Sequence, residues 1–340
     1  MDTIRVIEHE GARVAAVAAC VPPFAADNAE RAARACGAEK AASIVAATGF
    51  PSLRLAAHGT TTFDLMCAAS KEAIALSGIE AADFGAVVAV SVTPGFEMPA
   101  LSNRLQASLG TGRGTVALDV RAACSGYVAG LHLAAVYAKA TGKPVLLADG
   151  DVQSHVCDPL DAATAPVLSD AATATVVAPE PAGAEPWRFA FMSDGAQAGA
   201  LALPAGGKIK MDGFGVFRFV TVEAYSFIRD FMEATGTAAG AVDAFVPHQA
   251  NLYMVSRLAK TLGFPPESVW TCGGEYGNPG SASVPFALAR RLAPDRKSPL
   301  RLLLAGFGGG LSAAAALVGI SPAVKTRVFD YEGGGEGDAP

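Results

Sequence analysis

The chain has 340 residues, of which 51% are hydrophobic and 17% charged, and its 26 lysines and arginines against 32 acidic residues give a net charge of −6. This composition is typical of a globular protein with a sizeable core, and it excludes disorder over most of the length. The acidic balance and the lack of a basic run exclude a nucleic-acid groove, because phosphate binding needs clustered lysine and arginine.

The charged N-terminal stretch 1–13 lacks the apolar core of a secretory signal, which favours a cytoplasmic protein. Beyond it, strand-like runs alternate with long helical stretches, the signature of an α/β fold. Helices are predicted at 62–77, 100–109, 125–140, 222–235, 252–262 and 281–292. Strands are predicted at 86–92, 115–119, 145–149, 173–178, 244–246, 269–271, 300–305 and 314–320. The uncharged stretch 302–324 contains five glycines and a proline, so it indicates strands and a turn instead of a membrane helix.

The two halves of the chain resemble each other at one fixed offset. VLLADGD from Val145 matches LLLAGFG from Leu302, and VVAVS from Val87 matches AFVPH from Ala244, since 302 − 145 and 244 − 87 both equal 157. A duplicated half rich in βαβ units is the simplest interpretation. We therefore divide the chain into an N-terminal half over 1–180, a C-terminal half over 187–325 and a flexible tail over 326–340.

The six cysteines have neither CxxC nor metal-ligand spacing, which predicts reduced thiols without a disulfide framework or a zinc site. One of them, Cys124 in AACSG, lies where an apolar strand turns into a helix that is apolar on almost every face and must be buried. The positive end of a helix lowers the pKa of a thiol, so we expect a nucleophilic thiolate at Cys124. The alternative is a small core residue.

Two further side chains and one glycine run are candidates for chemistry. His248 follows a short strand, at the kind of strand end where functional residues of α/β folds collect, whereas the other four histidines are interpreted as structural. Asn278 lies in CGGEYGNPGSA, in a tight turn that either aims its amide or only needs asparagine for its geometry. The run 306–310 (GFGGG) completes neither a P-loop nor GxGxxG, but its backbone N–H groups suit an oxyanion hole.

Cys124 in AACSG, His248 in VPHQAN, Asn278 in YGNPGSAS and the closing GFGGGLS, in this order, resemble the β-ketoacyl-acyl carrier protein synthase III family of the thiolase superfamily. The resemblance implies a five-layered αβαβα thiolase-like fold built from two duplicated halves, usually as a homodimer. It implies that Cys124 takes an acyl group as a thioester, and that His248 Nε2 and the Asn278 amide assist decarboxylation of a malonyl thioester. The backbone N–H groups of Cys124 and Gly309 would form a second oxyanion hole. No metal or redox cofactor is implied.

The sequence also departs from the family at the places that commonly hold the phosphate end of CoA. A tryptophan and three arginines are replaced there by Ser43, Ala47, Ala162 and Tyr253. The loss of these groups argues against a short acyl-CoA held in the usual way. The GDGAGA-like turn is altered to SDAA at 169–172. Arg218, Arg257 and Lys260 form a basic patch that suits an acidic acyl carrier protein, with ordinary solvated charges as the alternative.

We therefore predict a condensing acyltransferase of the synthase III type, acting in a specialised secondary-metabolite or fatty-acid-related pathway. Its expected partners are acyl and malonyl thioesters, an acyl carrier protein and a second copy of the chain, with no nucleic acid and no membrane. Two alternatives remain open. One is an acyltransferase that passes the acyl group from Cys124 to an oxygen or nitrogen acceptor, and the other is a catalytically silent subunit of a heterodimer, against which the intact site residues count.

Overall fold

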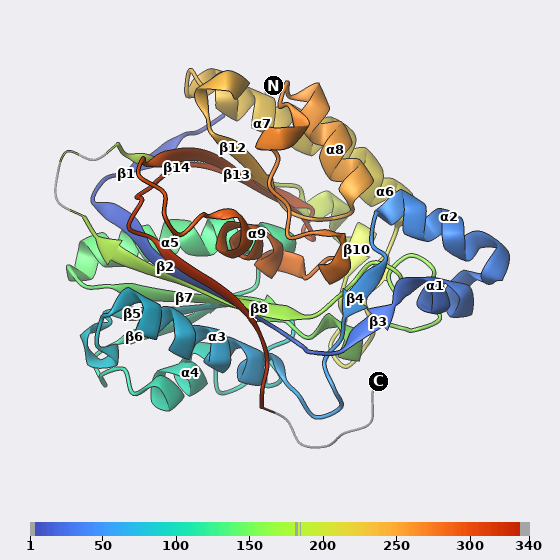
Figure 1. Cartoon of the computed structure of the whole chain (residues 1–340), viewed down its shortest axis with the longest axis horizontal. Coiled ribbons are helices and arrows are strands. Elements are labelled where there is room, and N and C mark those ends of the chain that lie inside the picture. Colours follow the sequence, from blue (N-terminus) through green and yellow to red (C-terminus); the bar gives the residue numbers. More distant parts are fainter. Residues whose placement is uncertain (1–3, 181–182, 184, 334–340) are drawn as a thin grey trace.

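Two large β-sheets with a pair of helices between them form the frame of the protein, in a computed structural model that describes residues 4–180, 183 and 185–333 (Figure 1). From edge to edge, the first sheet contains β15 (Lys325–Asp330), β2 (Ala12–Val21), β8 (Ala171–Pro179), β7 (Val145–Asp151), β5 (Ala86–Val90) and β6 (Val116–Val120). The second sheet contains β1 (Ile7–His9), β9 (Trp187–Ser193), β14 (Ser312–Ile320), β13 (Leu300–Gly308) and β12 (Ala244–Pro247). Two small ribbons pair β3 (Ala25–Asp27) with β4 (Ser52–Arg54), and β10 (Leu201–Ala202) with β11 (Lys210–Met211).

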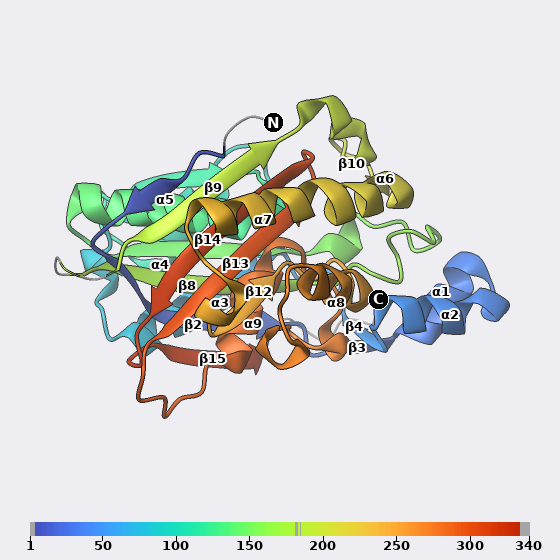
Figure 2. The ribbon, with the colours of Figure 1, turned by 90° about the horizontal axis from the view of Figure 1, so that it is seen from above.

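Three layers of helices alternate with the two sheets (Figures 1 and 2). The middle layer is α5 (Gly126–Thr141) with α9 (Ser283–Arg291), whose buried residues share one apolar core with both sheets. The outer layers are α3 (Thr62–Ser77) with α4 (Leu101–Leu109) on the first sheet, and α7 (Tyr225–Ala234) with α8 (Leu252–Thr261) on the second. At one end α1 (Asn28–Cys36) and α2 (Ala38–Thr48) project, and α2 contacts α8. The predicted five-layered αβαβα fold is confirmed.

Local sequence signals account for the ends of the helices that frame the site. α3 begins after Thr61, which exchanges hydrogen bonds with Asp64 in a capping box, and it ends at Gly78 in the left-handed conformation with a φ of 70°. α5 is apolar on nearly all faces because it lies between two sheets, and its exposed residues are confined to its last turn, 139–141. The capped outer helix and the largely buried central helix therefore differ in pattern for a physical reason.

The two sheets share one topology, which agrees with the predicted duplication. β5 and β7 are parallel, β7 and β8 antiparallel, and β8 and β2 antiparallel. β12, β13, β14 and β9 repeat this order and these directions. The counterpart of β6 is reduced, because the strand predicted at 269–271 forms only a parallel bridge between Val269 and Phe245. Each half also adds a strand to the other half's sheet, since β1 pairs with β9 and β15 pairs with β2.

Three expectations about the elements need correction. The tail predicted at 326–340 is wrong for its first residues, because β15 pairs with β2, and Val328 and Phe329 pack on the core. The remainder of the predicted tail, 334–340, lies outside the described residues.

The helix predicted at 222–235 begins earlier, since α6 (Gly213–Arg218) continues through a π-helical turn (Phe219–Ala224) into α7. Helices α1 and α2 were not predicted. Within the described ranges, no helix is both long and apolar enough to cross a membrane.

Candidate active site

Cys124 lies in a 3-10 turn (Ala123–Ser125) directly before α5, at the junction of the two halves. The preceding residue, Ala123, has a φ of 43°, a left-handed conformation that costs a non-glycine residue on the order of 1 kcal/mol. Glycines of β13 pack against the cysteine: a Cβ on Gly308 would lie 2.8 Å from the Cys124 sulfur, and one on Gly306 would lie 2.7 Å from the Cys124 carbonyl oxygen. The glycine run therefore serves close approach of β13 to the cysteine.

The expected thiolate at Cys124 is not what the structure supports. Burial raises the pKa of the Cys124 thiol to about 12, and the nearby carboxyl groups of Asp151 and Asp149 add to this increase. Hydrogen bonds from the backbone N–H groups of Gly309 and Cys124 act in the opposite direction and only partly offset the burial. The end of a helix stabilises a thiolate by roughly 1 kcal/mol, which is smaller than the cost of burying the charge. Cys124 is thus a neutral thiol that needs a base.

His248 follows β12 and is buried, with its ring against the ring of Phe307 at 5.5 Å between centroids. Its Nδ1 lies 3.1 Å from the carbonyl oxygen of Gly280 and 2.9 Å from the hydroxyl of Ser283, whereas Nε2 makes no hydrogen bond to the described residues. Burial lowers the pKa of His248 to about 4, so the imidazole is neutral at physiological pH. A neutral ring with an unengaged Nε2 can accept a proton from a thiol.

Asn278 is held in its turn from several sides, so the orientation of its amide is fixed. Its Oδ1 accepts a hydrogen bond from the Gly280 N–H at 2.9 Å, and its Nδ2 donates to the carbonyl oxygen of Ala250 at 3.4 Å. The backbone carbonyl of Asn278 accepts from Gln153 Nε2 at 3.0 Å and from the Ser169 N–H at 3.0 Å. Because Oδ1 is engaged and Nδ2 carries two protons, the amide remains a hydrogen-bond donor.

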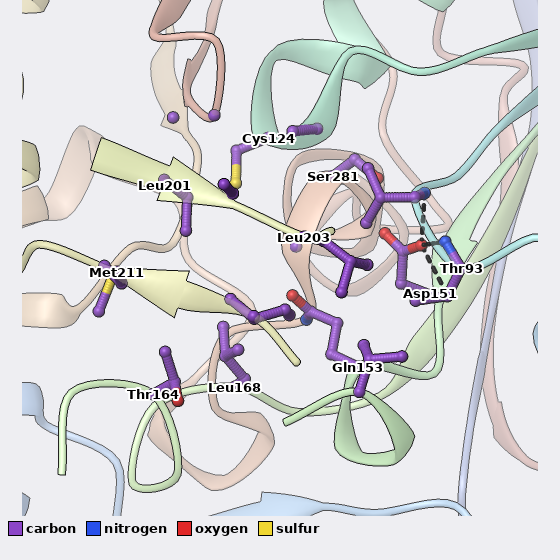
Figure 3. Close-up of a pocket in the computed structure, with 18 of the residues that line it drawn as sticks. Thr93, Cys124, Asp151, Gln153, Thr164, Leu168, Leu201, Leu203, Met211 and Ser281 are labelled. Carbon is purple, nitrogen blue, oxygen red and sulfur yellow. Dashed lines mark hydrogen bonds between the residues drawn. The ribbon is translucent and has the colours of Figure 1, made fainter. Parts of the chain in front are cut away.

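Two buried carboxyl groups, Asp149 and Asp151, lie at the carboxyl end of β7. Asp151 Oδ1 accepts hydrogen bonds from Ser91, Val92 and Thr93 at 2.7–2.9 Å, the surroundings of a charged carboxylate (Figure 3). Asp149 has a single side-chain partner, the hydroxyl of Ser281 at 2.5 Å, and its Oδ2 has none among the described residues. Burial raises the pKa of both carboxyl groups, and raises that of Asp149 well above its usual value, because Asp149 has fewer hydrogen bonds to offset the burial.

A cavity of about 890 Å³ connects the cysteine, the histidine and the asparagine, and Asp151 also lines it. Cys124, His248, Asn278 and Gly309 all line it, so the structure brings together the four residues predicted for catalysis and the oxyanion hole. The rest of the wall is largely apolar and includes Leu168, Leu201, Leu203, Ile209 and Met211 (Figure 3). Such a cavity suits an apolar acyl chain with its reactive end at the cysteine.

Three residues that support the site were not identified from the sequence. Ser283 and Gly280 contact His248 only because the start of α9 packs beside β12, and Gln153 reaches Asn278 across the two halves. No local sequence pattern predicts contacts between segments that are this far apart in the chain. Asp149 and Asp151 had a signal that was not used, because they are the two acidic residues at the carboxyl end of a buried strand.

The residues predicted for donor recognition lie outside the cavity. We use the name CoA clamp for the four positions at which the family commonly holds the phosphate end of CoA. Here these positions are exposed on α2, α8 and the loop after β7, and they carry Ser43, Ala47, Ala162 and Tyr253. The Ser43 hydroxyl donates within its own helix to the Lys40 carbonyl at 2.8 Å. Arg218, Arg257 and Lys260 are exposed on α6 and α8, whose neighbouring residues line the cavity. Arg218 forms an ion pair with Glu223 at 3.2 Å. The docking role of these three cations stays a prediction.

A cysteine at the start of the central helix of an αβαβα fold, sharing a cavity with a histidine and an asparagine, defines a condensing enzyme of the thiolase superfamily. Residues 118–195 match the family described as 3-oxoacyl-[acyl-carrier-protein] synthase III, and residues 232–320 match the C-terminal domain of that synthase. The chain belongs to the 3-oxoacyl-[acyl-carrier-protein] synthase III family.

Individual relatives agree with this assignment. The β-ketoacyl-[acyl-carrier-protein] synthase III of Rhodospirillum rubrum is 33% identical over 285 residues, covering 80% of this chain and 88% of the relative. The crystal structure of a 3-oxoacyl-(acyl-carrier protein) synthase from Burkholderia xenovorans superposes with a TM-score of 0.91 at 32% identity, covering 97% of this chain and all of the other. The priming β-ketosynthase of the R1128 polyketide pathway superposes at 0.82 with 31% identity, covering 94% and 99%.

Proposed function

We propose that this protein loads an acyl group onto Cys124 and condenses it with a malonyl thioester, losing CO2. The observation that carries the proposal is the convergence of Cys124, His248 and Asn278 on one largely apolar cavity. A specialised pathway is supported by the changed CoA clamp and by the likeness to a priming ketosynthase of polyketide synthesis. An acyl carrier protein as donor partner, a homodimer and a cytoplasmic location remain predictions.

In loading, the Cys124 sulfur attacks the thioester carbonyl of the donor while His248 Nε2 takes the thiol proton, because a thiol with a pKa of about 12 is hardly ionised at neutral pH. The donor thiol then leaves with the proton that His248 took from Cys124. The negative charge that develops on the carbonyl oxygen is stabilised by backbone N–H groups of Cys124 and Gly309. The product is a thioester on Cys124.

Condensation follows when a malonyl thioester enters the same cavity. Loss of CO2 leaves a pair of electrons on the malonyl carbon as an enolate, whose oxygen accepts hydrogen bonds from His248 Nε2 and Asn278 Nδ2. The enolate carbon then attacks the acyl carbonyl, forming the carbon–carbon bond and releasing the Cys124 sulfur as a thiolate, which takes up a proton from water to restore the thiol. These steps use only side chains and backbone amides of this chain, so we propose that no metal or redox cofactor takes part.

Intact-mass analysis and CO2 release test the proposal together. The protein is incubated with acyl-CoA and acyl-carrier-protein donors, and then with a malonyl thioester. We expect one acyl adduct, absent in Cys124→Ala and retained in Cys36→Ala, which removes a partly exposed thiol away from the cavity. CO2 release should depend on prior acylation. An adduct on the Cys124→Ala protein would overturn the assignment of the nucleophile.

The alternative acyltransferase predicts a loaded Cys124 that is cleared by an alcohol or amine without CO2. Asn278 favours condensation, because its free amide donor has a use at an enolate oxygen that a simple acyl transfer does not require. Adduct formation without CO2 release from any malonyl thioester would decide for the acyltransferase.

A further inference from the structure

The proposed function, on which this inference rests, asks His248 to do two opposite things. In loading, Nε2 must lack a proton so that it can take one from the Cys124 thiol. In condensation, Nε2 must carry a proton so that it can donate a hydrogen bond to the enolate oxygen. A neutral imidazole has one ring proton, so these are its two tautomers, and the group beside Nδ1 decides between them.

We propose that Ser283 is a positioning residue that allows His248 to hold its ring proton on either nitrogen, and so to serve in both halves of the reaction. The two partners of Nδ1 differ in kind. The Gly280 carbonyl oxygen, 3.1 Å away, can only accept, so it stabilises the tautomer with the proton on Nδ1. The Ser283 hydroxyl, 2.9 Å away, can also donate, and this donation stabilises the tautomer with the proton on Nε2.

The surroundings of Ser283 hold its hydroxyl in place for this role. Ser283 is the first residue of α9 and is fully buried, so water does not compete for its hydroxyl. Its oxygen accepts the backbone N–H of Gln249 at 3.2 Å, which occupies one lone pair and leaves the hydroxyl proton for His248. Gln249 directly follows the histidine in sequence, so Ser283 is hydrogen-bonded both to the His248 ring and to the backbone beside it.

The exchange between tautomers conserves charge and protons. One proton is taken up at Nε2 from water in the cavity, and one is released from Nδ1 to water when the buried contact between Nδ1 and Ser283 opens locally. The ring starts and ends neutral, which agrees with its complete burial. Without the serine hydroxyl, only the carbonyl of Gly280 remains beside Nδ1, and the ring is confined to the tautomer that accepts at Nε2.

Replacement of Ser283 by alanine tests this. In Ser283→Ala, loading of Cys124 should stay within about threefold of the wild type, whereas CO2 release should fall by about 100-fold, the usual effect of losing one oxyanion donor. The matched control is Tyr127→Phe, which removes another buried hydroxyl, bonded to Thr175 at 3.3 Å and away from the cavity. This control variant should change neither the rate of Cys124 loading nor the rate of CO2 release. Equal slowing of loading and CO2 release in Ser283→Ala would overturn the proposal.

A second measurement keeps the inference separate from the proposed function. In protein with 15N-labelled histidine, the His248 ring signals, assigned with His248→Gln, report which nitrogen carries the proton. We expect the wild type to populate both tautomers, and Ser283→Ala to show only the Nδ1-protonated one. An unchanged ring spectrum would overturn the role of Ser283 whatever the reaction is. A wild-type protein that never releases CO2, with the expected spectral change, would instead refute the condensing function.

Discussion

We call Cys124, His248, Asn278 and the adjoining glycines of β13 the floor of the cavity, and the exposed surface of α2, α6, α8 and the loop after β7 its entrance. The two regions differ in how closely their sequences keep the pattern of the family. On the floor, Cys124, His248 and Asn278 are buried or partly buried and fixed by many hydrogen bonds, and glycines pack directly against the cysteine. At the entrance, the four positions of the CoA clamp carry small or uncharged side chains and are exposed. The difference indicates tight geometric constraint on the residues around Cys124, and it is the basis of our prediction that the choice of donor has changed.

The glycine that packs against the reactive sulfur itself is Gly308, and replacing it should have the largest effect. In Gly308→Ala the new Cβ would lie 2.8 Å from both Cβ and the sulfur of Cys124, which cannot stay where it is. We expect loading of Cys124 to fall below detection in the intact-mass assay. Gly319→Ala, in neighbouring β14, has no atom within 4 Å of the new Cβ and should load normally. Normal loading by the Gly308 variant would show that the floor is more tolerant than its packing indicates.

Asn278→Asp should separate the two reactions that share the floor. The carboxylate keeps the acceptor for the Gly280 N–H, so the turn is retained, but it replaces the amide donor of Nδ2 beside a developing enolate. We expect loading to be preserved and CO2 release to slow by about 100- to 1,000-fold. Both rates are followed on the same protein by intact mass and CO2 capture. If loading and CO2 release declined together, Asn278 would be a turn residue only.

The burial of His248 predicts an unusual pH dependence of stability. The unfolded chain takes up a proton on this histidine near its ordinary pKa of 6.5, whereas the folded protein does so only near 4. Stability therefore falls as the pH is lowered from about 6.5 to 4, by up to about 3 kcal/mol. Urea unfolding at a series of pH values should show this slope, and His248→Gln should lose it. The exposed His58→Gln variant should keep the slope.

The same burial predicts the acid limit of loading. The neutral base remains available as the pH falls through 6.5, so the loading rate should stay level and decline only as the pH approaches 4. Rates of adduct formation measured between about pH 8 and 5 check this. A decline centred near 6.5 would place the base on an ordinary, solvated histidine instead of His248.

Prediction from sequence succeeded where a pattern is local. α3 was predicted correctly from 62 to 77, because the residues that cap it and those that form its apolar face all lie within one continuous segment. The predicted site residues Cys124, His248 and Asn278 lie at or near strand and helix ends and line one cavity, whereas their catalytic roles stay predictions. β2 was missed, because it is buried on both faces and its alanine-rich run has no alternation to distinguish strand from helix.

Properties that arise between distant segments could not be predicted. The direction of the Cys124 pKa shift was wrong, because a local feature, the helix end, was weighed without the burial and the carboxyl groups brought by β7. Ser283 was missed for the same reason, since its contact with His248 depends on how α9 packs beside β12.

The smallest expected effects lie at the entrance, where the comparison with the floor can be sharpened. Without the usual clamp, the same acyl group should load faster from a carrier protein than from CoA, and more slowly from the carrier as salt is raised. Arg257→Glu or Lys260→Glu should slow carrier loading by about three- to tenfold and leave CoA loading unchanged, because rim charges act mainly on encounter. Lys71→Glu, the same charge change on outer helix α3, should have no effect on either route. If CoA is the better donor, or if both routes respond alike to the α8 variants, the entrance has a rearranged CoA site and the basic patch is ordinary solvated surface.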